Sequence, residues 1–334
     1  MAHLKPGVPA PNLAPLMGQE AIREKGGVEY RELRARNLLN KCDSPRMPFN
    51  WTVNPYRGCA MGCRYCYAAY THEFMGIETP EQFHSLVYVK KGHEAETAAQ
   101  LAHVVRRGER IAIGAATDPY QPGEAEQKVT RRFLEQVARH RGVRLGITTK
   151  GALILRDVEL LQAIHRRSDL SIHVSLISPH AELVRRLDPW APAPEVRIEV
   201  MRRLTEAGLE VWLGLAPVLP AITDAERDLD ELLGRVARAG VRRLFWNMLF
   251  LRSPTREKYL RWLATEFPRL KEAYENAYRV RVYLRGSYRD RIGDLIRKLK
   301  TKHGYIERGE EAREEFPTEQ LALWPDPAGE KPTR

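Results

Sequence analysis

Three of the four cysteines in this sequence of 334 residues lie within eight positions of one another. Cys59, Cys63 and Cys66 follow the spacing C-x3-C-x2-C in the stretch NPYRGCAMGCRYCYA, and the fourth, Cys42, stands apart. Closely spaced thiols can bind zinc, form a redox-active dithiol or ligate an iron–sulfur cluster. These chemistries differ in the number of thiols that each one needs.

The number of thiols favours an iron–sulfur cluster. A structural zinc site needs four ligands, and no second pair of Cys or His with suitable spacing follows the loop. A redox dithiol would leave the third cysteine without a role, whereas three thiolates on a [4Fe-4S] cluster leave one iron open to a further ligand. Gly58 and Gly62 suit a loop that wraps a cluster, because glycine adopts backbone conformations that other residues avoid. Zinc and chance clustering are the alternatives.

Buried strands alternate with helices after this loop. Continuous apolar runs predict six strands, at 49–58, 111–117, 144–150, 170–178, 211–220 and 242–250. Apolar residues at helical spacing predict helices between them, at 126–139, 196–207 and 224–239. Short connections require parallel strands with right-handed crossovers. We expect an α/β fold, a partial (β/α)6 barrel of the TIM type, with a doubly wound open sheet as the alternative.

Composition divides the chain into four regions. They are an N-terminal extension at 1–49, the barrel at 50–252, a helical basic segment at 253–305 and a flexible tail at 306–334. The extension is expected to hold one helix near 28–40, and the basic segment two helices, at 256–277 and 288–302. A capping box of Thr223 and Glu226 is expected to begin the helix at 224–239.

A formal net charge of +11 favours anionic partners such as nucleic acid. Residues 279–302, which begin with Arg279 and end with Lys302, hold nine Lys or Arg with Tyr283 and Tyr288 between them. This composition suits phosphate contact and base stacking, and a solvated helix face with local ion pairs is the alternative. No apolar run is long enough to span a membrane and no apolar signal core is present, so the sequence predicts a cytoplasmic protein without a membrane partner.

A short peptide near the end of the chain suggests a protein partner. The stretch EQLALWP contains Gln320, Leu321, Leu323 and Trp324. It resembles the peptide by which bacterial DNA-repair and replication proteins dock on the sliding clamp. The alternative is a tail that packs on its own domain.

The motifs resemble a known family. The cysteine motif at the end of the first strand resembles the signature of the radical S-adenosylmethionine (SAM) enzymes. NPYRGCAMGCRYCYA, ATDPYQPGE, TTKGALILRD and LAPVLPAITD resemble the spore photoproduct lyases, often described as DNA repair photolyase-like, over about residues 35–300. The resemblance implies a partial barrel with the site at the C-terminal ends of its strands. It also implies that a [4Fe-4S] cluster cleaves SAM into methionine and a 5'-deoxyadenosyl radical that abstracts hydrogen from a substrate.

By this resemblance the cysteine loop would hold the cluster. Cys59, Cys63 and Cys66 would ligate three irons, and the amino and carboxylate groups of SAM would occupy the fourth. Tyr65 would lie against the adenine, and Tyr67 would belong to a radical relay. An electron donor such as a flavodoxin or ferredoxin would be a partner.

Four residues at later strand ends would complete the SAM site. Thr117 and Asp118 match the place where the superfamily binds the SAM amino group, and Lys150 would pair with the SAM carboxylate. Ser175 matches a position that contacts the ribose. Each has a structural alternative, since Asp118 can begin a turn, Lys150 can be solvated and Ser175 can satisfy a backbone group.

The sequence departs from the spore photoproduct lyases at one position. Ala115 and Ala116 stand where those enzymes carry a hydrogen-donor cysteine, and Cys42 is the only spare thiol. The expected substrate is a nucleic-acid lesion; a protein, a small molecule, or a non-catalytic iron–sulfur nucleic-acid binder are the alternatives. His72 and Glu73 could form an acid–base pair or a simple surface hydrogen bond.

Overall fold

Six parallel strands make up most of a seven-stranded sheet in the computed structural model, which describes residues 17–306 except 26, 46, 76–81 and 285. The sheet order is β11-β10-β9-β8-β7-β4-β3. The parallel strands are β4 (Trp51–Val53), β7 (Arg110–Ile113), β8 (Arg144–Thr149), β9 (Asp169–Ser175), β10 (Glu210–Val218) and β11 (Arg243–Met248). β3 (Leu39–Lys41) pairs with β4 in the antiparallel sense and forms one edge. Among the described residues, the edge strands β3 and β11 do not pair with each other, so the sheet does not close. The predicted partial, open barrel is therefore confirmed.

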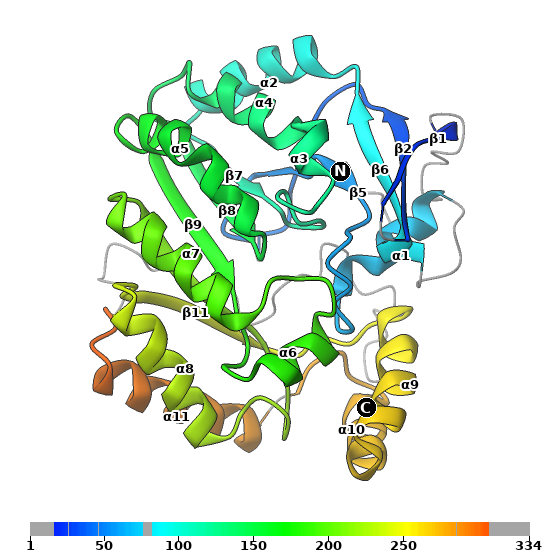
Figure 1. Cartoon of the computed structure of the whole chain (residues 1–334), viewed down its shortest axis with the longest axis vertical. Helices are drawn as coiled ribbons and strands as arrows, with labels where there is room; N and C mark the ends of the chain where they lie inside the picture. Colours follow the sequence, from blue (N-terminus) through cyan, green and yellow to red (C-terminus); the bar gives the residue numbers. More distant parts are fainter. Residues whose placement is uncertain (1–16, 26, 46, 76–81, 285, 307–334) are drawn as a thin grey trace, which may run out of the picture.

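Helices cover the outer face of this sheet. They include α4 (Val129–Val137), α5 (Val158–His165), α7 (Pro194–Glu206) and α8 (Glu226–Arg238), which follow one another along the sheet (Figure 1). In α8 the side chains of Leu229, Leu232, Leu233 and Val236 are buried, which confirms the predicted apolar stripe. The strands are continuous apolar runs because helices bury this face while the opposite face lines the barrel interior.

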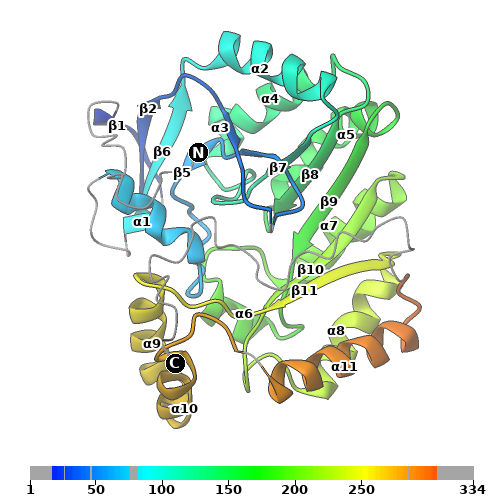
Figure 2. The same ribbon diagram turned by 180° about the vertical axis from the view of Figure 1, so that it is seen from behind.

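A second sheet lies beside the barrel (Figures 1 and 2). Its order is β1-β2-β6-β5, with bounds β1 (Met17–Lys25), β2 (Val28–Arg34), β6 (Leu86–Lys91) and β5 (Tyr56–Arg57). The predicted helix at 28–40 is therefore wrong, because this stretch forms β2 and β3. β2 is a strand because it pairs in parallel with β6, a partner more than fifty residues away that local helix propensity does not reveal.

Two further expectations need correction. The predicted first strand at 49–58 divides into β4 and β5, which belong to different sheets, at Asn54 and Pro55; proline has no amide hydrogen for a strand ladder. The predicted helix at 126–139 divides into α3 (Glu124–Gln127) and α4 at Lys128, whose φ is 51°.

The expected capping box does not form. α8 begins at Glu226 and has no side-chain cap, while the hydroxyl of Thr223 accepts a hydrogen bond from the amide of Leu219, 2.8 Å away. Thr223 therefore closes the turn before the helix.

The helical C-terminal region consists of α9 (Thr255–Glu266), a short 3-10 turn η4 (Pro268–Leu270), α10 (Lys271–Tyr278) and α11 (Ser287–Lys302). α11 packs against α8, and α9 packs against α10 (Figure 2). The predicted clamp-binding peptide with Leu321 and Trp324 lies outside the described residues and stays a prediction. No helix in the described part of the chain is long and apolar enough to cross a membrane.

Candidate cofactor site

All nine predicted site residues line one cavity of about 220 Å³ at the C-terminal ends of the barrel strands. They are Cys59, Cys63, Tyr65, Cys66, Tyr67, Thr117, Asp118, Lys150 and Ser175. The loop after β5 supplies the first five, and the ends of β7, β8 and β9 supply the others. Residues up to 116 positions apart in the sequence are thus brought to one place, as parallel strands with a common carboxyl edge require.

Both glycines of the cysteine loop have positive φ, +90° for Gly58 and +73° for Gly62. A Cβ on Gly58 would lie 2.6 Å from the carbonyl oxygen of Leu86, so only glycine fits there. Burial raises the pKa of Cys59 to about 12 and also raises the pKa of Cys63 and Cys66. The metal-free thiols are therefore protonated, and metal binding must release their protons.

The arrangement of the thiols fits a multi-iron cluster better than a single zinc ion. In the described part of the chain, no three His, Cys, Asp or Glu side chains converge closely enough to hold one metal ion. Three thiols set apart around one cavity suit a cluster whose irons take one cysteine each. The chemistry of the donor set and the single cavity therefore fit an iron–sulfur group.

Asp118 ties the end of β7 to the end of β8. Its Oδ1 accepts hydrogen bonds from the amide of Tyr120 (2.9 Å) and the hydroxyl of Thr149 (2.6 Å), and its Oδ2 accepts one from the amide of Lys150 (2.7 Å). The amide of Asp118 itself lies 3.4 Å from the sulfur of Cys59 and donates to it. This carboxylate is a structural centre of the site as well as part of the cavity wall.

Thr117 joins the cysteine loop to β7. Its hydroxyl donates to the carbonyl oxygen of Gly58 (2.6 Å) and accepts from the side-chain amide of Gln121 (3.0 Å). Gln121 also accepts a hydrogen bond from the amide of Ala60 (2.9 Å). Sequence reasoning missed Gln121, which holds the loop through two of its backbone groups.

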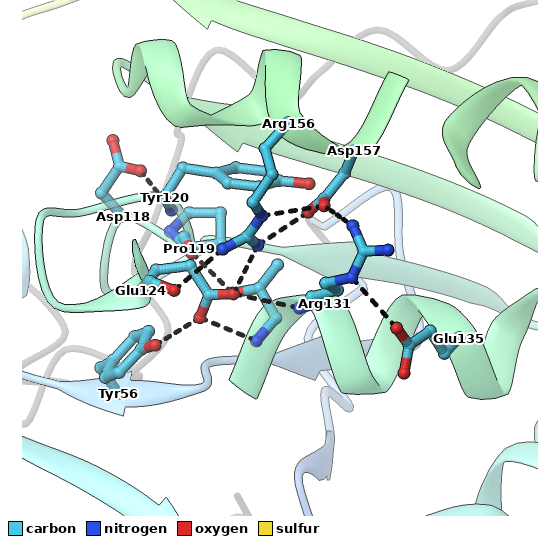
Figure 3. A network of polar contacts seen from close by, with 10 residues as sticks. Tyr56, Asp118, Pro119, Tyr120, Glu124, Arg131, Glu135, Arg156 and Asp157 are labelled. Atoms are coloured by element: carbon cyan, nitrogen blue, oxygen red, sulfur yellow. Dashed lines mark hydrogen bonds and ion pairs between the residues drawn. The ribbon is translucent and has the colours of Figure 1, made fainter. Parts of the chain in front are cut away.

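A buried charge network follows Asp118 in the chain and holds the segment that begins there (Figure 3). Glu124 accepts hydrogen bonds from the hydroxyl of Tyr56 and from two backbone amides at the start of α4. Arg156 lies 2.9 Å from both Glu124 and Asp157, whose side chains are fully buried. The network joins the ends of the two motifs ATDPYQPGE and TTKGALILRD, so these charged residues fix the strand ends that carry Asp118.

Lys150 places its charge inside the cavity. Its Nζ lies 5.5 Å from the centre of the Tyr65 ring and makes no hydrogen bond or ion pair with another described residue. Burial alone would lower the pKa of Lys150, but Cys63 when it is ionised and the carboxylate of Asp188 raise it above its ordinary value. Lys150 is therefore a charged donor without a fixed partner, next to the hydroxyl-bearing Ser175 on the cavity wall.

Tyr67 begins the 3-10 helix η2 (Tyr67–Met75) and crosses the cavity wall to β7. Its hydroxyl donates a hydrogen bond to the carbonyl oxygen of Ala115, beside the position where the spore photoproduct lyases carry a cysteine. Burial raises the pKa of Tyr67 well above its ordinary value, so the phenol keeps its hydrogen at neutral pH.

Sequence reasoning also missed a buried ion pair behind the cavity. Nη1 of Arg197 lies 3.1 Å from Oδ2 of Asp188, and both side chains are 0% exposed. Arg197 carried a signal in the sequence, because it shares the buried face of α7 with Val200, Met201 and Leu204. A charged residue on an apolar helix face indicates a specific partner, whereas Asp188 carried no such signal.

His72, Glu73 and Cys42, to which the sequence assigns no definite role, do not line the cavity. The ring of His72 is buried and lies 3.1 Å from the carbonyl oxygen of Leu86, and burial lowers its pKa to about 4. Glu73 is exposed. Cys42 follows β3, and its amide donates to the carbonyl oxygen of Asn50. His72 therefore packs behind the cysteine loop, and neither it nor Glu73 or Cys42 is a cavity-lining residue.

The basic segment is partly neutralised. Lys298 pairs with Glu226 at 2.9 Å, and Lys302 pairs with Asp230 at 2.7 Å, so the second half of α11 fits the alternative of local ion pairs. Arg279 and Arg281 are exposed and make no ion pair with other described residues. Both precede Tyr283 in the chain, which forms a β-bridge with Phe250, and Phe250 lines the cavity.

Comparison with known proteins identifies the family. The sequence matches the model of the radical SAM superfamily over residues 53–233. An uncharacterized protein of Mycobacterium bovis is 36% identical over 282 residues, which cover 83% of this chain and 82% of that protein. An uncharacterized protein of Acidianus two-tailed virus is 28% identical over 214 residues, with 62% and 69% covered. The chain belongs to the radical SAM superfamily of enzymes, whose cofactors are an iron–sulfur cluster and SAM.

Solved structures define the fold more closely. A spore photoproduct lyase complexed with dinucleoside spore photoproduct matches with a TM-score of 0.63 at 15% identity, over 82% of this chain and 79% of that one. A mutant of spore photoproduct lyase, with one cysteine replaced by serine, matches with a TM-score of 0.62 at 15% identity, over 81% and 79%. The predicted spore photoproduct lyase-like fold is confirmed.

Proposed function

We propose that Cys59, Cys63 and Cys66 ligate a [4Fe-4S] cluster and that SAM binds at its open iron. The observation that carries this proposal is the single cavity lined by the three thiols and by every predicted SAM-binding side chain. When bound, the cluster and SAM supply a 5'-deoxyadenosyl radical by one-electron cleavage of a sulfonium carbon–sulfur bond. The electron comes from a carrier such as a flavodoxin or ferredoxin.

Lys150 binds the carboxylate of SAM in this proposal. Its Nζ is charged, lies within the cavity and makes no hydrogen bond or ion pair to another described residue. A charged donor of this kind forms a strong hydrogen bond to a carboxylate. The ring of Tyr65 under Lys150 offers a flat surface for the adenine, and the hydroxyl of Ser175 is available for the ribose.

Asp118 receives the amino group of SAM. Its Oδ2 accepts only the amide of Lys150, so this oxygen can accept a further hydrogen bond from an ammonium group. The hydroxyl of Thr117 is already engaged with Gly58 and Gln121. Thr117 therefore acts by fixing the cysteine loop, and Asp118 by contact with the cofactor.

Tyr67 is the catalytic residue that we propose on the substrate side. Its hydroxyl is held at the cavity wall by the carbonyl oxygen of Ala115, and its raised pKa keeps the phenol protonated. A protonated phenol can donate a hydrogen atom and accept one back. Tyr67 thus takes the place of the hydrogen-donor cysteine that is missing at Ala115 and Ala116.

The substrate in this proposal is a nucleic acid. The fold neighbour with the dinucleoside spore photoproduct supports it, as does the position of Arg279 and Arg281. These exposed arginines come four and two residues before Tyr283, which bridges to Phe250 on the cavity wall. Exposed cations suit contact with the phosphates of a nucleic acid, one nucleotide of which would enter the cavity.

Release of 5'-deoxyadenosine tests the function. Protein reconstituted with iron and sulfide under anaerobic conditions is incubated with SAM and dithionite, and the products are separated by chromatography. We expect 5'-deoxyadenosine from the native protein and none from Cys59→Ala. No release from the native protein, or equal release from Cys59→Ala, would overturn the proposal.

A further inference from the structure

The loop that carries Cys63 rests on a segment that follows α6 (Ala181–Leu187). The amide of Arg64 donates to the carbonyl oxygen of Leu187 at 2.9 Å, and the amide of Trp190 donates to that of Met61 at 3.4 Å. These two hydrogen bonds bracket Cys63 on both sides. Residues 187–192, called the strap below, are therefore the backbone neighbour of this cluster ligand.

Gly62 shows how closely the strap approaches. A Cβ on Gly62 would lie 2.7 Å from Cε3 of Trp190 and 3.0 Å from Cγ of Pro189. A larger residue would clash with the rings of Trp190 and Pro189. The close packing of the loop against the strap therefore requires glycine at position 62.

Arg197 holds the strap in place. Its Nε donates to the carbonyl oxygen of Pro192 at 2.7 Å, and its Nη1 donates to Asp188 at 3.1 Å and to the carbonyl oxygen of Ser175 at 3.0 Å. One buried guanidinium therefore joins both parts of the strap to the end of β9. Arginine suits this task because its planar fork holds several acceptors in fixed directions.

The pair retains two polar atoms without partners. Oδ1 of Asp188 and Nη2 of Arg197 are buried and make no hydrogen bond within the described part of the chain. The hydroxyl of Tyr65 faces the carboxylate of Asp188, and burial together with this carboxylate raises the pKa of Tyr65 well above its ordinary value. Asp188 also faces Cys63 and Lys150, whose charged states it influences. A buried carboxylate with a free oxygen beside these groups has the position of a second layer around a cofactor site.

We propose that the Asp188–Arg197 pair is a positioning device for SAM, holding Cys63, Tyr65 and Lys150 in the arrangement that receives it. Arg197 fixes the strap and the carbonyl end of β9, while Asp188 orients Tyr65 and Lys150 from behind. Neither residue lines the cavity, so the pair acts through its neighbours. This inference rests on the proposed function.

Neutral replacement of the whole pair tests it. Asp188→Asn combined with Arg197→Gln removes both charges together, so no unpaired charge remains buried. We expect this double variant to bind the native amount of iron and to unfold near the native temperature. Its dissociation constant for SAM should rise roughly ten- to a hundredfold, as for other groups behind a metal site. The change that SAM causes in the electron paramagnetic resonance spectrum of the reduced cluster should be lost.

The matched control variant changes Arg186, which lies close to the strap. Arg186→Gln breaks the exposed ion pair between Arg186 and Glu266, next to the strap but away from the cavity. It should keep native SAM affinity and the native spectral change. Equal losses in Arg186→Gln and the double variant, or native SAM binding by the double variant, would overturn the inference.

A second variant keeps the inference testable if the double variant does not fold. Arg197→Lys keeps the charge opposite Asp188 but cannot reach all three acceptors at once. We expect it to fold and to bind SAM more weakly than the native protein, and native affinity would overturn the inference. If the native protein itself bound no iron or no SAM, the proposed function would fail instead, so the two failures are distinguishable.

Discussion

Lys150 in the cavity and Lys298 and Lys302 on α11 carry the same charge in opposite surroundings. The two lysines of α11 are exposed and pair with carboxylates of α8, whereas Nζ of Lys150 is enclosed and makes no ion pair with a described residue. Paired surface charges contribute little to stability or to binding of another anion. A charge held without a partner in a cavity is available for a ligand. The comparison teaches that contacts, more than the number of basic residues, indicate where an anion binds.

The cysteine loop should give the largest effect. Cys59→Ala removes one of the three proposed cluster ligands, and Cys42 does not line the cavity to replace it. We expect the iron content after reconstitution to fall to near zero, with SAM cleavage lost. Iron analysis and the visible absorption of the cluster measure this, and Cys42→Ala is the control that should retain both. Loss of iron in Cys42→Ala would contradict the assignment of the ligands.

Lys150 comes next. Lys150→Gln keeps most of the length of the side chain but removes the charge from the cavity. Because a hydrogen bond to a charged group is worth about 1.5–3 kcal/mol, we expect the dissociation constant for SAM to rise roughly ten- to a hundredfold. Isothermal titration with reconstituted protein measures it. Lys298→Gln should bind SAM as the native protein does, and equal weakening in both variants would break the comparison.

His72 gives a pH dependence of stability. Its ordinary pKa is 6.5 and burial lowers the folded pKa to about 4, so the unfolded chain binds a proton more readily between these values. Stability therefore rises with pH through this window. His72 alone should make the free energy of unfolding about 2 kcal/mol lower at pH 5 than at pH 8.

His72→Gln tests this pH dependence. Glutamine keeps a donor for the carbonyl oxygen of Leu86 but does not titrate. Urea unfolding at pH 5 and pH 8 should show a smaller difference between the two pH values than the native protein shows. An unchanged difference would mean that His72 does not remain neutral behind the loop.

We expect the smallest effects from changes in the basic segment, where the paired lysines and the exposed arginines should behave differently. Lys298→Gln with Lys302→Gln should leave the free energy of unfolding nearly unchanged, because exposed ion pairs contribute little. Arg279→Gln with Arg281→Gln should weaken binding to a single-stranded oligonucleotide and reduce its salt dependence, since two phosphate contacts are lost. Urea unfolding measures the first pair, and fluorescence anisotropy at several salt concentrations measures the second. Equal salt dependence in the native protein and the Arg279 and Arg281 variant would contradict the phosphate contacts.

The parts of the fold that the sequence predicted are those with a local pattern. The five strands after residue 105 are continuous apolar runs, and α8 has an apolar stripe at helical spacing, so both could be read directly. β2 is predicted as a helix because most of its residues are Glu, Arg and Leu, which favour helices, and because its partner β6 lies far along the chain. Pairing between distant segments overrides local propensity.

The same distinction applies to the site. The three cysteines and the strand-end residues have short motifs, and they lie together in the cavity. Gln121, Asp188 and Arg197 act through hydrogen bonds to groups that are distant in the sequence. Only a folded structure brings these partners together, although the position of Arg197 on an apolar helix face gave one indication.

A crystal structure of the anaerobically reconstituted protein with SAM tests the central claim most directly. The account predicts that the sulfurs of Cys59, Cys63 and Cys66 each bond one iron of a four-iron cluster. It also predicts that Nζ of Lys150 lies within hydrogen-bond distance of the SAM carboxylate. A single metal ion on these cysteines, or SAM bound away from Lys150, would contradict it.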